Sequence, residues 1–418
     1  MIIHTVEDGD TVYSISKQYG IPASRLVIDN ALIPERKLIP GQALLVSNPT
    51  RTDVVRGGDS IGSVAERNEI SVLSLLQNNP TLSASELTPS QTLNIRYDKS
   101  ESKPILVHAY TGAASDADIA KRLPYISLLS VQNAARLQNG EVTPMGNRAP
   151  LLATAKKYRV LPFLCIESTD EYGRYGENAV SQILASPDST ERFIQSAVDT
   201  AKSGGFGGIE VVLPPASGGD AYRFAELLLA MQSVCDEQGL RLASPWLPFA
   251  DLAAHILENQ IDTADLTPIW NYLWDDEKTA APAAPYTKAE TLLSADFVPK
   301  HAAKLLLGIP TFGIDYTKSA NGYRKRIVGA GDALLKANAP TLSAKFDEES
   351  RTPYVTYTED EHRFPVEHFL RYEDAHSYFE KIGLVDKFGL GGVSVQSLEH
   401  DAPVFWQMLN QRYEIAKY

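Results

Sequence analysis

The segment Gly204–Pro215, GGFGGIEVVLPP, holds one ionisable side chain within a strand-like apolar run. Glu210, Val212 and Pro214 alternate along it, so a strand places all three on one face. A carboxyl group at Glu210 is a candidate general acid or base. The structural alternative is a buried carboxyl that is hydrogen-bonded or protonated, because unpaired buried charge is costly. We favour this alternative, because no second carboxylate stands beside Glu210 in the segment.

Other acidic groups follow three further apolar runs. They are Glu167, Asp170 and Glu171, then Asp275-Asp276, and finally Glu399-His400-Asp401. Carboxylates of solvated loops are the commoner explanation for such groups. The sequence contains no nucleophilic serine motif, phosphate-binding glycine loop or Cys/His metal spacing, so we expect neither a cofactor nor a metal.

The elements that must position these residues alternate between apolar strands and amphipathic helices, which is typical of an α/β fold, the (β/α)8 TIM barrel. Its active-site face lies at the ends of the strands, where the acidic groups fall. A helix is predicted from Ser186-Pro187 to Lys202, because serine caps helices and proline suits their first turn. The eight predicted strands are Ile105–Tyr110, Ile126–Val131, Leu161–Ile166, Gly208–Leu213, Leu242–Trp246, Thr267–Tyr272, Lys304–Pro310 and Gly391–Gln396. The barrel is expected over residues 103–418, with an inserted α+β subdomain over about 314–372.

An internal repeat occupies the first hundred residues. Gly9-Asp10 recurs as Gly58-Asp59 and Asn30 as Asn79, each 49 positions later without a gap. Each copy is predicted to form a strand, two helices and a closing strand, with Gly-Asp-Thr/Ser supplying a turn and a helix cap. The first copy reads HTVEDGDTVYSISKQYGIPASRL and PGQALLV, and it closely resembles the LysM module, which binds the N-acetylglucosamine-containing glycans peptidoglycan and chitin.

The LysM resemblance implies two modules, over residues 1–48 and 52–97, each with a sugar groove between two loops. The second copy departs from the pattern at Gly62 and Ser90. A tandem pair gains affinity for a polymeric glycan by effective concentration. The structural alternative is that the Asp residues of these loops only cap helices and the Asn residues only terminate them. The implied groove residues are Asp10, Thr11, Val12, Asn30, Ala31, Leu32 and Ile33, and then Asp59, Ser60, Ile61, Asn79, Pro80 and Thr81.

The opening G-F-x-G-I of the Glu210 strand resembles the fourth barrel strand of family 18 glycoside hydrolases, which reads about G-[FY]-D-G-[IV]-D-[IL]-D-[FWL]-E. The resemblance puts the family's four acidic positions on Gly207, Glu210, Val212 and Pro214. The last is the general acid, and the one before it supports the substrate's N-acetyl group during substrate-assisted hydrolysis. Proline and valine can do neither, so the resemblance implies a barrel that does not hydrolyse ordinary family substrates.

Three other segments extend the family 18 resemblance well beyond the fourth strand, and with the LysM pair the resemblance covers nearly the whole chain. They are KLLLGIPTFGIDY, IWNYLWD and YEDAHSYFEKIGLVDKFGLGGVSV. Together with the LysM pair, they resemble bacterial spore cortex-lytic N-acetylglucosaminidases. The family's cleft tyrosine is retained as Tyr272, whereas Gln396 replaces a tryptophan that floors the sugar site. The residues expected to line a remaining cleft are Trp246, Tyr272, Trp274, Phe312, Tyr316 and Gln396, although strand-end aromatics are as often packing residues.

Composition narrows the classes of partner. The net charge of −13 argues against nucleic acid and anionic membranes, and neutral glycans remain open. Cys165 and Cys235 lie in apolar segments and are expected to be buried thiols. No apolar run is long enough to span a membrane, and MIIHTVEDGD lacks signal-peptide features, so we expect no ordinary signal peptide unless one has been removed.

Three functional hypotheses follow. The first is a protein of the spore cortex, spore coat or cell wall that binds peptidoglycan or chitin-like glycans and carries a catalytically silent barrel. The second is an active N-acetylglucosaminidase that uses a displaced acid. The third is a spore-coat scaffold whose barrel binds coat or wall proteins.

Overall fold

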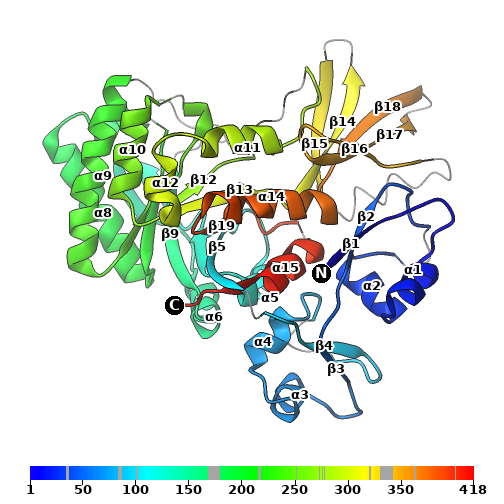
Figure 1. Ribbon diagram of the computed structural model, residues 1–418. Coiled ribbons are helices and arrows are strands. Elements are labelled where there is room, and N and C mark those ends of the chain that lie inside the picture. The colour runs from blue at the N-terminus through cyan, green and yellow to red at the C-terminus, as the bar shows by residue number, and fades with distance from the viewer. Residues whose placement is uncertain are drawn as a thin grey trace.

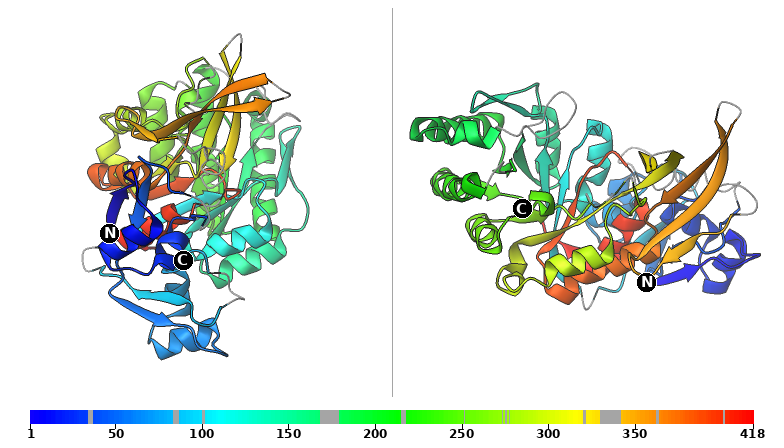
Figure 2. Two further views of the ribbon diagram at one scale, coloured as in Figure 1. Left: turned by 90° about the vertical axis from the view of Figure 1, so that its right-hand side faces the viewer. Right: turned by 90° about the horizontal axis from the view of Figure 1, so that it is seen from above.

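The computed structural model describes residues 1–33, 37–82, 87–99, 102–167, 179–214, 218–250, 252–272, 274, 276, 278–319, 322–329, 342–361, 364–400 and 402–418. A barrel forms the body of the molecule, and two small modules lie beside it (Figure 1). Seen from above, helices α8–α10 lie at one end of the molecule, and the modules lie at the opposite end with the inserted sheet (Figure 2). No described helix is both long and apolar enough to cross a membrane.

Eight parallel strands form the barrel, in the order β11-β10-β9-β6-β5-β19-β13-β12. Isolated parallel bridges, Ala243 to Leu266 and Trp246 to Ile269, join the two ends of this row and close it. The predicted TIM-barrel fold is therefore confirmed. The strands are β5 (Lys103–Tyr110), β6 (Leu128–Val131), β9 (Leu161–Glu167), β10 (Gly208–Val212), β11 (Arg241–Ala243), β12 (Thr267–Ile269), β13 (Leu305–Ile309) and β19 (Gly392–Val395).

All eight predicted strands occur, and six of them are shorter than expected, three by two or more residues at one end. β11 stops at Ala243 rather than Trp246, because Pro245 has no N–H to donate to a ladder. β12 stops at Ile269 rather than Tyr272, where the Asn271 N–H turns back to the Ile269 carbonyl at 2.8 Å. β6 begins at Leu128 rather than Ile126, because a 3-10 turn at Leu123–Tyr125 comes directly before Ile126.

Helices cover the outside of the barrel (Figure 1). The predicted helix after Ser186 is confirmed as α8, with the Ser186 side chain accepting from the Ser189 N–H and with Pro187 in the first turn. The helices are α5 (Asp116–Arg122), α6 (Ala149–Lys157), α7 (Ala179–Ile183), α8 (Pro187–Gly204), α9 (Gly218–Gln238), α10 (Ala254–Thr263), α11 (Tyr286–Leu293), α12 (Val298–His301), α14 (Ala375–Phe388) and α15 (Pro403–Arg412). A hairpin, β7 (Ala135–Gln138) with β8 (Glu141–Pro144), and a short strand, β20 (Tyr413–Ile415), which pairs with β5, complete the barrel domain.

The insertion between β13 and α14 contains a five-stranded antiparallel sheet in the order β15-β14-β18-β17-β16. Its strands are β14 (Phe312–Ser319), β15 (Gly322–Gly329), β16 (Lys345–Asp347), β17 (Thr352–Glu361) and β18 (Phe364–Arg371). Asp315 lies inside this sheet and accepts hydrogen bonds from Arg326 Nη2 at 2.8 Å and from Tyr357 Oη at 3.1 Å. These contacts hold three strands of the insertion together.

Each N-terminal module folds as predicted, with two helices over an antiparallel strand pair. The first contains β1 (Ile2–Thr5), α1 (Val12–Tyr19), α2 (Ala23–Asp29) and β2 (Ala43–Val46), and the second contains β3 (Arg51–Val54), α3 (Ile61–Arg67), α4 (Val72–Gln77) and β4 (Thr92–Arg96). The helix caps are Thr11 and Ser60, each in a reciprocal capping box, and not Asp10 and Asp59. The aspartates instead close the preceding turn, since Asp10 accepts the Glu7 N–H at 2.9 Å and Asp59 accepts the Arg56 N–H at 2.8 Å.

The first module shares its core with the barrel through β2, which is buried along its whole length. Leu44 and Val46 pack inside the module, whereas Ala43 and Leu45, which point the opposite way, pack into the main barrel core. The Ala43 N–H also donates to Asp374 at 3.0 Å. The two expected thiols, Cys165 and Cys235, are both free and buried.

Candidate functional site

β10 delivers Glu210 and Val212 to the interior of the barrel, toward the ends of the strands where TIM-barrel active sites form. Glu210 is fully buried at 0% exposure, and Val212, two residues nearer the strand end, is also 0% exposed. The two residues share one face of the strand, as their alternation predicts. The carboxyl group therefore lies below a layer of apolar side chains.

Hydroxyl donors hold both oxygens of Glu210. Tyr110 Oη donates to Oε1, and Ser130 Oγ donates to Oε2. His108 Nε2 lies 2.8 Å from Ser130 Oγ and 3.4 Å from Glu210 Oε2. Because Ser130 gives its proton to Glu210, we assign Nε2 as the protonated nitrogen of His108. Glu210 is thus hydrogen-bonded within the core, and its surroundings match the structural alternative.

Two further contacts complete this buried polar network. His108 Nδ1 lies 2.8 Å from Ser394 Oγ, and Trp270 Nε1 donates to Tyr110 Oη at 2.8 Å. Burial raises the pKa of Tyr110 well above its ordinary value, and the nearby Glu210 carboxylate adds to that rise. Tyr110 is accordingly a neutral hydrogen-bond donor at neutral pH.

The acid and support positions implied by the family resemblance are apolar in three dimensions as well. Val212 packs with Cys165, Leu247, Trp270 and Tyr272 in one cluster of buried side chains. Pro214 is half-buried just beyond the strand. Burial also raises the pKa of the Cys165 thiol well above its ordinary value, so this thiol is not a reactive nucleophile. A carboxylate at position 212 would have to replace part of this cluster.

Glu167 is a second acidic residue beside this cluster. It ends β9, and its backbone pairs with Val212 on β10. Gln132 Nε2 lies 3.2 Å from Glu167 Oε2. Burial raises the pKa of Glu167, and the hydrogen bond from Gln132 offsets part of that rise. The expectation of a solvated loop carboxylate is therefore wrong for Glu167, because this residue is the last of a strand and only half-exposed.

The other acidic groups predicted at this face have local partners. Asp276 accepts from the Lys278 N–H at 2.9 Å, which caps a turn. Glu399 accepts from the Ala113 N–H at 2.6 Å, and the His400 ring lies 6.3 Å from the Phe312 ring. Asp170, Glu171, Asp275 and Asp401 lie outside the described residues. The described carboxylates at Asp276 and Glu399 thus hold loops.

The predicted aromatic cleft is only partly assembled. Trp246 is 7% exposed and packs on Phe297, the residue before α12, within the main core. Tyr316 is fully buried, with its hydroxyl donating to the Ala281 carbonyl at 2.6 Å. Tyr272 is also buried, within the cluster around Val212. Trp274 is half-buried, with Nε1 bonded to Asn271 and the Lys288 ammonium 5.3 Å from its ring centre.

Gln396 and Phe312 complete the set of predicted cleft residues. Gln396 is half-buried, and its Oε1 is a buried acceptor that has no hydrogen-bond partner among the described residues. Phe312 is 6% exposed and belongs to the core beneath the inserted sheet. Sequence reasoning missed Tyr110, His108, Ser130 and Trp270, which surround Glu210. The alternation of His108 with Tyr110 in the apolar strand KPILVHAY was the available signal.

The asparagines predicted at the LysM grooves are structural. Asn30 is 7% exposed, and it accepts from the Leu45 N–H at 2.7 Å and donates to the Leu45 carbonyl at 2.8 Å. Asn79 makes the equivalent pair of bonds with Asn94 in the second module. Each asparagine therefore ties the second loop of its module to the closing strand.

The remaining predicted groove residues differ between the modules. Val12, Leu32 and Ile33 are half-buried, and Thr11 and Ala31 are exposed. In the second module, Ser60 and Thr81 are exposed, whereas Ile61 and Pro80 are buried. The first module thus presents more of its predicted groove to solvent than the second.

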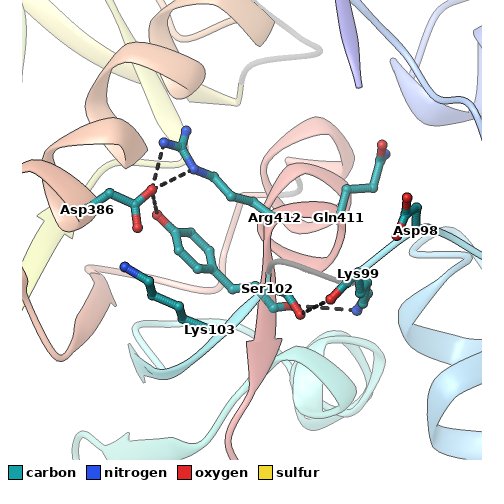
Figure 3. A pocket seen from close by; sticks show the side chains of 8 residues that line it. Asp98, Lys99, Ser102, Lys103, Asp386, Gln411 and Arg412 are labelled. Atoms are coloured by element: carbon teal, nitrogen blue, oxygen red, sulfur yellow. Dashed lines mark hydrogen bonds and ion pairs between the residues drawn. The ribbon is translucent and has the colours of Figure 1, made fainter.

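A cavity of about 580 Å³ lies at the opposite end of the barrel from the Glu210 strand end, between the linker, β5, α14 and α15 (Figure 3). Its charged groups mostly bind one another: Arg412 Nε and Tyr413 Oη both contact Asp386, at 2.9 and 3.0 Å. Burial lowers the pKa of Lys99 to about 8, and this ammonium donates to Asn410 at 2.8 Å. These pairs join the linker and the C-terminal helix to the barrel. The described residues contain no cluster of three or more potential metal ligands.

Known proteins share this arrangement of domains. The family described as Glycosyl hydrolases family 18 matches residues 173–401, and the LysM domain matches residues 4–47 and 54–96. The Cortical fragment-lytic enzyme of Bacillus cereus is 24% identical over 443 residues, which cover 99% of each chain.

Two crystal structures of the spore cortex-lytic enzyme SleL share the fold. The Bacillus megaterium QM B1551 protein has a TM-score of 0.79 at 20% identity, and the Bacillus cereus protein has a TM-score of 0.78 at 23% identity. Each comparison covers 100% of this chain and 99% of the other. Because the family match alone spans more than half of the 418 residues, the chain belongs to glycosyl hydrolases family 18 and carries two LysM domains at its N-terminal end.

Proposed function

We propose that the protein binds peptidoglycan-type glycans of N-acetylglucosamine through its LysM region, and that its barrel does not hydrolyse them. The observation that carries this proposal is the apolar cluster around Val212, together with Pro214, at the positions where the family resemblance requires a supporting carboxylate and a general acid. The fully enclosed Glu210 cannot reach a sugar bound outside that cluster. Intact LysM folds beside a silent barrel suit recognition without cleavage.

The similarity to spore cortex-lytic proteins favours the spore cortex, spore coat or cell wall as the location. The names of the relatives in Bacillus refer to the spore cortex, and the chain matches them over nearly its whole length. Peptidoglycan is therefore the preferred ligand over chitin, although both contain N-acetylglucosamine. Coat or wall proteins remain proposed partners of the barrel surface.

Sedimentation tests the binding half of this proposal. The full chain should pellet with insoluble spore peptidoglycan, and soluble N-acetylglucosamine oligomers should release it. An unrelated acidic protein of similar size serves as the control for trapping. If the chain stays in the supernatant at physiological salt, the proposed function is wrong.

Glu167 supports a second candidate function, a glycoside hydrolase with a displaced acid. Its carboxyl group lies at the end of the strand next to β10, and burial raises its pKa, as a general acid requires. In this alternative, purified peptidoglycan is cleaved, and Glu167→Gln lowers the rate by about 100- to 10,000-fold. We rank it second because the neighbouring carboxylate, Glu210, is fully buried and both of its oxygens accept from Tyr110 and Ser130, so it is not free to act as the second catalytic group.

A further inference from the structure

The two LysM modules are not equivalent, and we propose that the first module alone forms the glycan-binding surface, with Tyr13 as its stacking residue, while the second module is a bracket that docks on the barrel. This inference rests on the proposed function and deepens it, because it names the module and the side chain that contact the sugar. It replaces the expectation of two cooperating sites with a single site.

The barrel occupies the second loop of the second module. Arg122, at the end of α5, is 6% exposed, and its Nη1 donates to the Pro80 carbonyl at 2.9 Å. Pro80 is itself buried. A backbone carbonyl that already accepts from a buried guanidinium is not available to a sugar hydroxyl, because charge-assisted hydrogen bonds are strong. This half of the second module's groove is therefore occupied by a contact with the barrel.

The helix that leads into this loop is also fixed to the barrel. Tyr125 Oη donates to the Leu76 carbonyl at 2.6 Å, and Gln77 Nε2 donates to the Pro124 carbonyl at 2.8 Å. From the other side, Asn410 on α15 donates to Asn78 Oδ1 at 2.8 Å. Figure 1 shows α4 beside the barrel, with α3 turned away from it. The loop after α4 consequently cannot open without breaking these bonds.

The first module meets the barrel with a different loop. Its hydrogen bonds to the barrel include residues 40–47: the Ala344 N–H donates to the Pro40 carbonyl at 2.7 Å, Asp374 accepts from Ala43, and Gln411 Nε2 donates to Ser47 Oγ at 3.0 Å. Ala31, the position equivalent to Pro80, is exposed. The second loop of the first module is therefore more exposed at this position than its counterpart in the second module, and Thr11 of its first loop is also exposed.

Tyr13 offers an exposed aromatic ring directly after the predicted first loop of the groove, Asp10–Val12. It is the second residue of α1, and its side chain is 72% exposed. A tyrosine ring offers an apolar face with a polar hydroxyl, which suits the mixed apolar and hydroxyl surface of a sugar ring. The equivalent position 49 residues later is Gly62, which has no side chain. The second module thus lacks both the open loop and the aromatic residue.

Calorimetric titration of the full chain with N-acetylglucosamine hexamer tests this inference. We expect one site per chain. Tyr13→Ala should weaken binding by roughly 3- to 10-fold, as for the loss of an aromatic contact. The matched variant Gly62→Ala, at the equivalent exposed position, should bind like the parent chain. Circular dichroism checks that each variant keeps its fold.

The outcomes separate this inference from the proposed function. Two sites per chain, or an unchanged affinity of Tyr13→Ala, would overturn the assignment of the first module. A parent chain that binds neither the hexamer nor peptidoglycan would instead contradict glycan binding itself, and the inference with it. Arg122→Ala frees the Pro80 carbonyl. If this variant still binds the hexamer and a second site appears, the docking role of the second module is supported.

Discussion

Glu210 illustrates how one carboxyl group serves the core of a barrel rather than its mouth. Tyr110 and Ser130 donate to its two oxygens, and His108 supports Ser130 from behind. Replacing one of the two oxygens by an NH₂ group would leave one of the two hydroxyl donors without its acceptor. Burial without a hydrogen-bond partner costs about 1–3 kcal/mol per group, so the network is sensitive to small alterations.

Glu210→Gln should therefore lower the free energy of unfolding by about 1–3 kcal/mol, because an amide nitrogen would face a hydroxyl donor. Denaturant unfolding followed by tryptophan fluorescence measures this change. Glu226→Gln, an exposed position on α9, is the matched control and should change stability by less than about 0.5 kcal/mol. Equal stability of the two variants would mean that the network around Glu210 contributes little.

At the scale of elements, most of the barrel was readable from sequence, because apolar strands and amphipathic helices carry periodic patterns. The ends of β11 and β12 could not be predicted in this way, because they are set by the missing N–H of Pro245 and by a tight turn at Asn271. The caps were misassigned between neighbouring residues, Asp10 and Thr11, which both suit a helix start. Within the site, Glu210 was found, whereas Tyr110 and Ser130 were missed, because they come from strands distant in sequence.

Helix α14 is tied to the chain before it by a buried ion pair. Lys381 Nζ lies 2.5 Å from Glu373 Oε1, and both side chains are nearly inaccessible to solvent. Burial raises the pKa of Glu373 and lowers that of Lys381, in each case against the attraction of the partner. An intact buried ion pair contributes little net free energy to folding. Removing one member is costly, because it leaves the other charge buried without a partner.

Lys381→Met should lower the free energy of unfolding by about 3–5 kcal/mol at neutral pH. The loss should be smallest below about pH 4, where Glu373 is protonated in both states, and should grow as pH rises through its raised folded pKa. Unfolding curves at several pH values measure this. Lys387→Met is the matched control. It removes a half-exposed lysine on the same helix, α14, that pairs with Glu290 on α11, and it should change the free energy of unfolding little. A loss that is independent of pH would argue against a buried Glu373 charge.

At the scale of the whole molecule, the LysM pair and the barrel form one packed unit. Asp374 binds Ala43 across 331 positions of sequence, and Asn410 binds Asn78 across 332. Contacts at such separation leave no periodic signal, so the docking of the modules could not be predicted from the sequence. This packing holds a glycan-binding surface at a fixed distance from a barrel whose own chemistry is absent in our proposal.

Incubation of the full chain with purified spore cortex peptidoglycan, followed by chromatography of the soluble products, tests the central claim most directly. The account predicts that the protein pellets with the polymer and that no muropeptides or new reducing ends appear above the background of a protein-free sample. An active family 18 N-acetylglucosaminidase is the positive control. Release of muropeptides by the parent chain that disappears in Glu167→Gln would contradict the silent barrel and establish the displaced-acid hydrolase in its place.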